Sequence, residues 1–314
     1  MPIDSLFAGT TRPNEQLFFS RGNPTDPRMG DRVRSHRSDY ATAEVVVLGC
    51  PQDEGVRRNG GRVGAAAGPD TIRDRLYRLV AIEQLRLFDL GNTIIGATLE
   101  ETHAVQRALV AEIVRDGKIV ISLGGGNDIS YPDCAGLADA EPGAVLAFNI
   151  DSHYDVREDR PRNSGTPYRM LIEEGRIQPQ HFWELGSQPF AVAQAHTAYL
   201  HQCGAHLRTL KEWRSAGVAA TLEQILAGSA CPAIFWGIDL DVVRAADSPG
   251  VSAPNPTGLS AEEIVQVAEL AGRDPRSRVF EISELNPNYD LDQRSSRLAA
   301  ILIWSFLAYR SGAY

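Results

Sequence analysis

Short apolar runs alternate with segments of helical periodicity along most of the chain. Continuous apolar runs predict buried strands at 44–49, 87–91, 118–121, 144–150, 182–186, 206–210, 233–239 and 278–284. Between them, apolar residues recur at spacings of three and four, which predicts helices at 69–77, 102–115, 167–174, 191–202, 221–228, 260–271 and 291–309. Strands that are apolar on both faces must be covered on both faces. The pattern therefore predicts a three-layer α/β/α fold with a central parallel sheet.

The pattern changes near residue 43. Residues 1–42 are polar and rich in Arg, Asp, Pro and Ser, which predicts an irregular N-terminal arm. From residue 43 to residue 314 strands and helices alternate without an internal repeat, which predicts a single domain. The chain has 314 residues, 43% of them apolar, and this is enough to bury one large core.

Two of the predicted strands end in closely spaced acidic residues. Asp151, His153 and Asp155 follow the run at 144–148, and Asp239 and Asp241 close the run at 235–238. Alternation of side chains along a strand would place each set on one face. One reading is that these are solvated acids at strand ends. Two such clusters in one chain instead favour a pair of divalent metal ions, because so many carboxylates repel one another without cations.

Two further features accompany the acidic clusters. A glycine turn, 124–126, leads into Asn127 after the strand at 118–121, but the lysine of a phosphate-binding P-loop is missing. We expect these glycines to let the backbone pass close to a buried site. Glu284 stands at the end of the strand 278–284, where it could meet a cationic group of a substrate, although a surface acid would also fit.

Charge and cysteine usage narrow the class of protein. The net charge of −9 argues against a nucleic-acid partner and leaves a small molecule as the expected substrate. The four cysteines are isolated and show no C-x-x-C spacing, which is typical of a reducing compartment. We find no pattern of a signal peptide or of a membrane span, so the expected location is the cytoplasm, without a membrane partner.

The order and spacing of these motifs resemble those of a known family. Gly124 to Asp128, Asp151 to Asp155, Asp239 to Asp241 and Glu284 to Pro287 are similar to the signature blocks of the ureohydrolases, the binuclear manganese enzymes that include arginase, agmatinase and formimidoylglutamase. The blocks 53–64, 163–169 and 184–189 resemble the formimidoylglutamase branch. The resemblance covers roughly residues 44 to 310 and implies an arginase-like fold.

The resemblance also implies roles for individual residues. Asp151 and Asp239 would bridge two divalent ions, most simply Mn²⁺. The remaining ligands would be Asn127 and Asp155 at the first ion, and His153 and Asp241 at the second. A metal-bridging hydroxide would attack the amidine carbon, with Asp155 receiving its proton and Glu284 pairing with the protonated nitrogens of the substrate.

Other residues are expected to bind the rest of the substrate. The two carboxylates of an N-formimidoyl-glutamate need cations or hydrogen-bond donors. An arginine-rich loop and a second loop offer Arg57, Arg58, Asn59, Arg62, Asn163, Ser164 and Thr166. The alternative for the arginine loop is a solvated surface turn.

Two positions depart from most of the family. Asn127 stands where arginases have a histidine ligand, and Ser164 stands where arginases and agmatinases have another histidine. The Ser164 form resembles the formimidoylglutamase branch, whereas Asn127 replaces imidazole by a weaker, neutral donor.

These observations lead to one expected function and two alternatives. We expect hydrolysis of N-formimidoyl-L-glutamate to L-glutamate and formamide, a step of histidine degradation. The alternatives are a hydrolase of another guanidino compound, such as agmatine or guanidinobutyrate, that releases urea, and a metal-poor family member without catalytic activity. The resemblance also implies a homo-oligomer, either a trimer or a hexamer.

Overall fold

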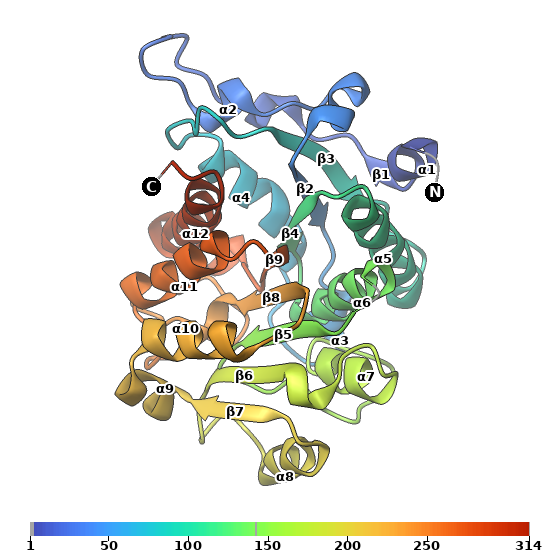
Figure 1. Cartoon of the computed structure of the whole chain (residues 1–314), viewed down its shortest axis with the longest axis vertical. Helices are drawn as coiled ribbons and strands as arrows, with labels where there is room; N and C mark the ends of the chain where they lie inside the picture. Colours follow the sequence, from blue (N-terminus) through green and yellow to red (C-terminus); the bar gives the residue numbers. More distant parts are fainter. Residues whose placement is uncertain (1–2, 142, 314) are drawn as a thin grey trace.

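One nine-stranded sheet organises the molecule (Figure 1). The computed structural model describes residues 3–141 and 143–313. The strand order is β1-β3-β2-β4-β9-β8-β5-β6-β7. The strands are β1 (Thr10–Thr11), β2 (Val45–Cys50), β3 (Leu87–Thr93), β4 (Ile119–Gly124), β5 (Val145–Ile150), β6 (Phe182–Ser187), β7 (His206–Thr209), β8 (Ala233–Asp239) and β9 (Ser277–Ser283). The β1–β3 pair is antiparallel and the other neighbouring pairs are parallel.

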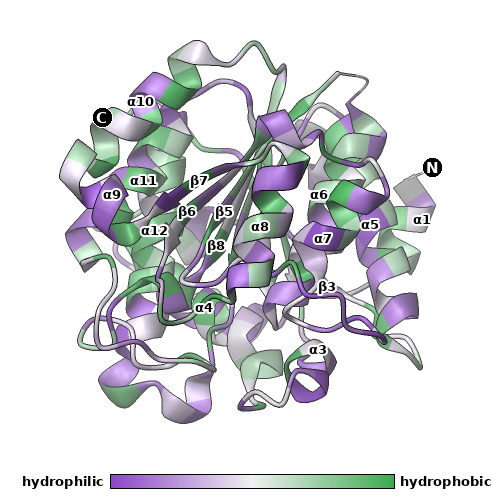
Figure 2. Ribbon diagram, turned by 90° about the horizontal axis from the view of Figure 1, so that it is seen from below, coloured by the Kyte–Doolittle hydropathy of each residue, from purple (hydrophilic) through white to green (hydrophobic). Residues whose placement is uncertain are grey.

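Helices cover both faces of the sheet, which Figure 2 shows from its edge. One face carries α4 (Gly68–Leu76), α9 (Leu210–Ala216), α10 (Val218–Gly228), α11 (Ala261–Arg273) and α12 (Arg294–Arg310). The other face carries α1 (Ile3–Ala8), α5 (Leu99–Arg115), α6 (Ser130–Ala140), α7 (Pro167–Glu173) and α8 (Gln194–Cys203). The predicted three-layer α/β/α architecture is confirmed.

The strands contribute side chains to two separate hydrophobic cores, one on each face of the sheet. In β2, Val45 and Val47 belong to the core beneath α4 and α12, whereas Val46 and Leu48 belong to the core beneath α5 and α6. All four side chains are buried. This is the two-residue period of a strand with both faces covered, and it explains why the strands read as continuous apolar runs.

Several helices begin where the sequence supplies a capping box. Thr98 and Glu101 satisfy each other's backbone amides at the start of α5, and Ser260 and Glu263 do the same at the start of α11. The short helix α9 was not predicted. Its first turn depends on Thr209 capping the backbone of Glu212, while only Leu210 and Trp213 are buried, too few residues for a visible apolar period.

The segment before β2 lies against the rest of the molecule. It contains α1, β1, the one-turn helix α2 (Met29–Arg32) and the 3-10 helices η1 (Glu15–Leu17) and η2 (Arg37–Thr42), joined by irregular chain. Backbone pairing of Thr10 with Thr93 and of Thr11 with Asn92 adds β1 to the edge of the sheet. Within the described residues, no helix combines the length and apolar character needed to cross a bilayer.

A buried ion pair joins α4 to β3. The guanidinium of Arg73 donates through Nε to Oδ2 of Asp89 at 2.9 Å and through Nη2 to Oδ1 at 3.1 Å. Both side chains are 0% exposed, and the Tyr77 hydroxyl donates a further bond of 2.6 Å to Asp89. This two-pronged contact fixes the helix on the sheet.

Candidate metal centre and active site

The four central strands, β4, β9, β8 and β5, bring the predicted site residues to one edge of the sheet. Asn127 follows β4 after the glycine turn, and Glu284 directly follows β9. Asp239 is the last residue of β8, and Asp151 is the first residue after β5. All four lie at the carboxyl ends of parallel strands, where sheets of this kind hold their ligands. The sequence thus predicted the correct edge.

Five acidic and imidazole side chains converge there. Asp151, His153 and Asp241 form one group, and Asp151, Asp155 and Asp239 form another. Within each group, one ligand atom from every residue lies within 4.8 Å of the others. Asp151 belongs to both groups, so the arrangement suits two adjacent ions that share a carboxylate ligand.

The backbone that presents these residues is a turn. The strand β5 ends at Ile150, and the backbone N–H of His153 donates to Oδ1 of Asp151 at 2.7 Å. Asp155 has a φ of +47° and Glu284 a φ of +65°, in the left-handed region that non-glycine residues rarely adopt. The prediction that side chains 151–155 alternate along a strand is therefore wrong. They converge because the chain bends beyond the strand, and the two unusual φ values lie at residues of the site.

Burial and mutual repulsion disfavour the charged form of the carboxyl groups. The pKa of Asp151 is raised well above its ordinary value by burial, then by Asp241 and Asp155. Burial, followed by Asp241 and Asp151, likewise raises the pKa of Asp239. Burial raises the pKa of Asp155 to about 6. The neighbouring carboxylate of Asp241 raises the pKa of His153.

Two buried oxygens at this site lack a protein partner. These are Oδ1 of Asp241 and Oε2 of Glu284. A buried carboxylate oxygen without a donor is costly, and a divalent cation supplies the missing charge. Carboxylate oxygens and an imidazole nitrogen form a donor set that suits manganese-type ions. The side chains present therefore fit a pair of such ions.

The amide of Asn127 faces the carboxylates with its nitrogen. Nδ2 donates to Oδ2 of Asp155 at 2.7 Å and lies 3.4 Å from Oδ2 of Asp151. The oxygen Oδ1 accepts from the hydroxyls of Ser283 at 2.7 Å and Ser130 at 3.1 Å. Both hydroxyls can accept as well as donate, so a half-turn of the amide would present its oxygen to a metal ion without losing these contacts.

A cavity of about 450 Å³ opens above the acidic residues. Asn59, Arg62, Ser164 and Glu284 line it. The proposed metal ligands that also line it are Asn127, His153, Asp155, Asp239 and Asp241. Nδ2 of Asn59 donates to the Ser164 hydroxyl at 3.0 Å, which joins the two predicted substrate loops.

Asn163 and Thr166 shape the loop behind this wall. The Thr166 hydroxyl donates to the backbone oxygen of Asn163 at 2.9 Å, and Oδ1 of Asn163 accepts from the backbone of Gly165 at 2.8 Å. Both side chains are thus used within the loop, and their contact with a substrate stays a prediction.

The arginines expected to meet substrate carboxylates are already engaged. Arg57 and Arg58 form ion pairs with Glu54, and Arg58 also with Glu100. Arg62 donates to the backbone oxygens of residues 251 and 252, and its guanidinium lies 3.9 Å from the centre of the Tyr289 ring. Arg62 therefore braces the cavity wall with its charged group.

Arg157 is a cavity cation that the sequence interpretation missed. It lines the same cavity, its side chain is 51% exposed, and its closest carboxylate, that of Asp159, lies 3.9 Å away. His196 lines the cavity nearby, and its pKa is lowered by burial and by Arg157. The sequence gives no local signal for Arg157, because it lies beyond the end of β5 and its place in the cavity depends on tertiary neighbours.

Comparison with known proteins agrees with this geometry. The model of the arginase family matches residues 43–308. The chain belongs to the arginase family. The predicted resemblance to the ureohydrolases and the arginase-like fold are thereby confirmed.

Relatives within the arginase family carry more specific names. A formimidoylglutamase of Nocardia farcinica is 35% identical over 296 residues, covering 89% of this chain and 93% of its own. A formimidoylglutamase of Chromobacterium violaceum is 34% identical and covers 83% of this chain and 86% of its own. The crystal structure of Trypanosoma cruzi formiminoglutamase with Mn²⁺ superposes with a TM-score of 0.86 at 35% identity, covering 91% of this chain and 99% of that one.

Proposed function

We propose that this arginase-family chain hydrolyses N-formimidoyl-L-glutamate to L-glutamate and formamide. The observation that carries the proposal is the layout of one cavity. Carboxylates that could bind metal, those of Asp155, Asp239 and Asp241, lie at its floor together with Glu284. Arg157 lies in its wall. A substrate with an amidine at one end and carboxylates at the other matches this distribution of charge. Relatives named formimidoylglutamase cover most of the chain and support the same substrate.

Two Mn²⁺ ions are the proposed cofactors, as in the similar Trypanosoma cruzi structure. Asp151 and Asp239 would be shared between them, with Asn127 and Asp155 at one ion and His153 and Asp241 at the other. Such ions neutralise the carboxylates and lower the pKa of water, so that a nucleophile is available near neutral pH.

The chain's own residues would bind and orient the amidine. Glu284 holds Oε1 on the backbone N–H of Asn127 at 2.9 Å, which leaves Oε2 free for the protonated nitrogens of the substrate. Asp155, a half-buried carboxyl that lines the cavity, would take the proton released when water adds to the amidine carbon. That proton would then reach the departing nitrogen as the C–N bond to glutamate breaks.

The other end of the substrate would be held by the cavity wall. Arg157 would pair with a carboxylate of the glutamate moiety, because a guanidinium offers two parallel N–H donors. Asn59 and Ser164, joined by their hydrogen bond, would supply further polar contacts. A guanidino substrate with an amino group at its far end, such as agmatine, would place a cation next to Arg157 and be disfavoured.

The test is a substrate panel with purified, manganese-loaded protein. Formiminoglutamate, agmatine, arginine and guanidinobutyrate are supplied separately, and formamide, urea and ammonia are measured. We expect formamide and glutamate in equal amounts from formiminoglutamate. Urea release from a guanidino compound, with no formamide from formiminoglutamate, would contradict the proposal.

We also propose that the protein acts as a cytoplasmic homo-oligomer. Cys50, Cys134 and Cys231 are buried, unpaired thiols, which suit a reducing compartment. Light scattering of the purified protein tests the assembly, for which we expect a trimer or a hexamer.

A further inference from the structure

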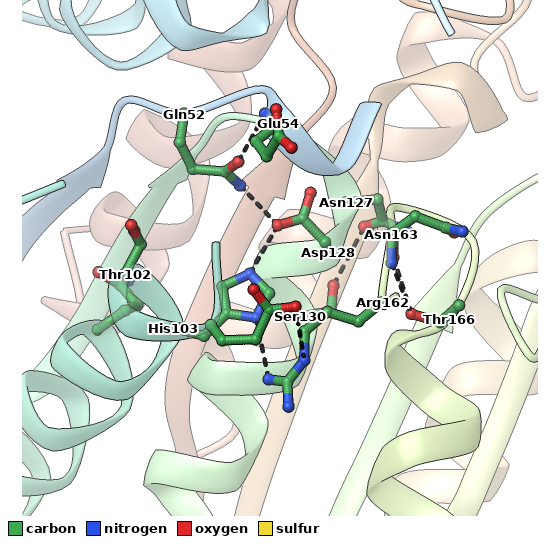
Figure 3. Close-up of polar contacts among 12 residues, drawn as sticks. Gln52, Glu54, Thr102, His103, Asn127, Asp128, Ser130, Arg162, Asn163 and Thr166 are labelled. Atoms are coloured by element: carbon green, nitrogen blue, oxygen red, sulfur yellow. Dashed lines mark hydrogen bonds and ion pairs between the residues drawn. The ribbon is translucent and has the colours of Figure 1, made fainter. Parts of the chain in front are cut away.

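A buried polar network lies directly behind the Asn127 turn (Figure 3). Its centre is Asp128, the next residue in the chain, which is only 1% exposed. Oδ2 of Asp128 accepts a hydrogen bond of 2.6 Å from Nε2 of Gln52 and lies 2.7 Å from Nε2 of His103. Figure 3 shows the two side chains reaching Asp128 from separate segments, with His103 on α5.

His103 has a second partner on its other ring nitrogen. Nη1 of Arg162 lies 3.4 Å from Nδ1 of His103. A guanidinium can only donate, so Nδ1 accepts this bond and Nε2 carries the hydrogen that is donated to Asp128. One imidazole thus links Arg162 to Asp128, and the ring is 1% exposed.

Arg162 belongs to the loop that forms the substrate wall. It directly precedes Asn163 and Ser164, and its backbone oxygen accepts a bond of 3.1 Å from Arg58. The backbone N–H of Ser164 in turn donates to the backbone oxygen of Gly55 at 3.2 Å. The loop is therefore held between α5 and the helix α3 (Glu54–Arg58).

Asp128 is also packed against α3. A Cβ atom added to Gly55 would lie 1.9 Å from Oδ1 of Asp128, so only glycine lets the carboxylate approach the helix this closely. The backbone N–H of Glu54, the first residue of α3, donates to Oε1 of Gln52 at 3.0 Å. The same Gln52 donates to Asp128 through its amide nitrogen, so one side chain is hydrogen-bonded both to the start of α3 and to the turn that carries Asn127 and Asp128.

We propose that His103 is a positioning residue. It holds the loop that carries Arg162, Asn163 and Ser164 in a fixed position relative to the turn that carries Asn127 and Asp128. Its Nδ1 side sets the place of Arg162 and hence of Ser164, and its Nε2 side sets the place of Asp128 and hence of Asn127. The residue touches neither substrate nor metal. The inference rests on the proposed function for its substrate measurement, but its metal measurement is independent of the substrate.

Two amide substitutions of His103 test the hydrogen bonds of its two ring nitrogens separately. In a glutamine side chain the terminal nitrogen takes the place of Nε2, so His103→Gln keeps a donor to Asp128 and loses the acceptor for Arg162. In an asparagine side chain the amide takes the place of Nδ1, so His103→Asn keeps an acceptor for Arg162 and loses the donor to Asp128.

The expected results differ in kind. His103→Gln raises KM for formiminoglutamate about three- to tenfold, with manganese affinity within about twofold of the native protein. His103→Asn weakens manganese binding about three- to tenfold, with KM at saturating manganese within about twofold. KM comes from initial rates, and manganese affinity comes from calorimetric titration of the metal-free protein. Equal shifts in both variants, or a lower melting temperature alone, would overturn the proposal.

Control variants keep the result interpretable. His201→Gln alters an exposed histidine on α8 and leaves both constants unchanged. Arg162→Met removes the guanidinium that donates to Nδ1, together with its contacts to Glu100 and the Tyr131 ring, and raises KM at least as much as His103→Gln does. An unchanged KM in Arg162→Met contradicts the proposal even where the His103 variants fail to fold. A native protein without activity on formiminoglutamate would contradict the proposed function, while the manganese titrations of the two His103 variants still decide the role of His103.

Discussion

The side-chain amide of Asn127 donates a hydrogen bond of 2.7 Å to the carboxylate of Asp155, a residue of the same proposed metal site. In the absence of metal, this contact offsets part of the negative charge of the cluster. A metal ion bound at this site must therefore displace the amide nitrogen before the amide oxygen can coordinate. This rearrangement should lower the binding affinity of one of the two ions and leave that of the other unchanged.

Replacement of Asn127 by histidine tests this relationship. Imidazole is a stronger ligand than an amide oxygen for manganese-type ions. Asn127→His should therefore raise the binding affinity of the more weakly bound ion by about tenfold. Activity should rise at limiting manganese and stay near the native value at saturation. Asn127→Ala should weaken the same ion. Calorimetric titration that finds two equally tight ions in the native protein, unaffected by Asn127→His, would contradict this account.

Removal of the Arg157 guanidinium should weaken substrate binding. A hydrogen-bonded charged contact contributes about 1.5–3 kcal/mol, so Arg157→Ala should raise KM for formiminoglutamate about ten- to hundredfold. The turnover number should change much less, because Arg157 lies in the wall above the acidic floor. Arg157→Lys should recover part of the loss, since a lysine keeps the charge without the paired donors. The matched control is Arg57→Ala, which removes an exposed arginine paired with Glu54.

Manganese should stabilise the protein more strongly as the pH rises from 5 to 8. In the metal-free protein, burial and neighbouring carboxylates raise the pKa of Asp151 and Asp239, and burial raises that of Asp155 to about 6. The folded metal-free protein therefore holds protons that the unfolded chain releases above about pH 4. Its stability falls as the pH rises through these raised pKa values.

The bound metal reverses this dependence, because it binds the ionised carboxylates and competes with protons. Calorimetry of matched metal-free and manganese-loaded samples should give melting temperatures that differ little at pH 5 and widely at pH 8. A difference that is constant across this range would contradict the role of these carboxyl groups as ligands.

Loss of the buried counter-charge of Arg73 should destabilise the fold. Asp89→Asn breaks the fully buried pair and leaves the half-exposed carboxylate of Asp70, 3.1 Å away, as the remaining anionic partner of Arg73. We therefore expect a loss of about 3 kcal/mol, at the lower end for a broken buried pair. Urea denaturation of the metal-free protein measures this change. The control is Glu83→Gln, which breaks an exposed pair with Arg32 and should cost about 0–1 kcal/mol. Comparable losses in the two variants would show that the buried pair contributes no more than a surface pair.

The fold could be predicted because the apolar pattern within short stretches of the sequence identifies its strands and most of its helices. The runs at 44–49 and 233–239 are apolar on both faces, and that property alone requires a covered parallel sheet. The acidic residues could be predicted because each stands at the end of such a run. The α9 helix escaped prediction because it depends on one capping box and two buried side chains.

The substrate side of the site was harder to predict because its contacts join distant parts of the chain. Arg58 and Arg62 resembled free cations in the sequence, but Glu100 and the backbone of residues 251–252 engage them in the folded protein. Arg157 lies on a loop where its closest carboxylate is 3.9 Å away, so its charge remains available. No local pattern distinguishes these cases, since pairing depends on tertiary neighbours.

The position of β9 in the sheet has a consequence for how the protein is made. This strand is the last to be synthesised, yet it lies between β4 and β8 in the middle of the sheet. The strands β1–β4 and β5–β8 therefore remain two unconnected half-sheets until residues 277–283 leave the ribosome. Asn127 follows β4 in one half, whereas Asp151 and Asp239 lie at the ends of β5 and β8 in the other, so we expect the complete proposed metal site to form only once β9 joins the two halves. We therefore expect the two ions to be acquired together only after β9 has joined the halves, and we expect a chain that ends before β9 to lack the Asn127 ligand at the site.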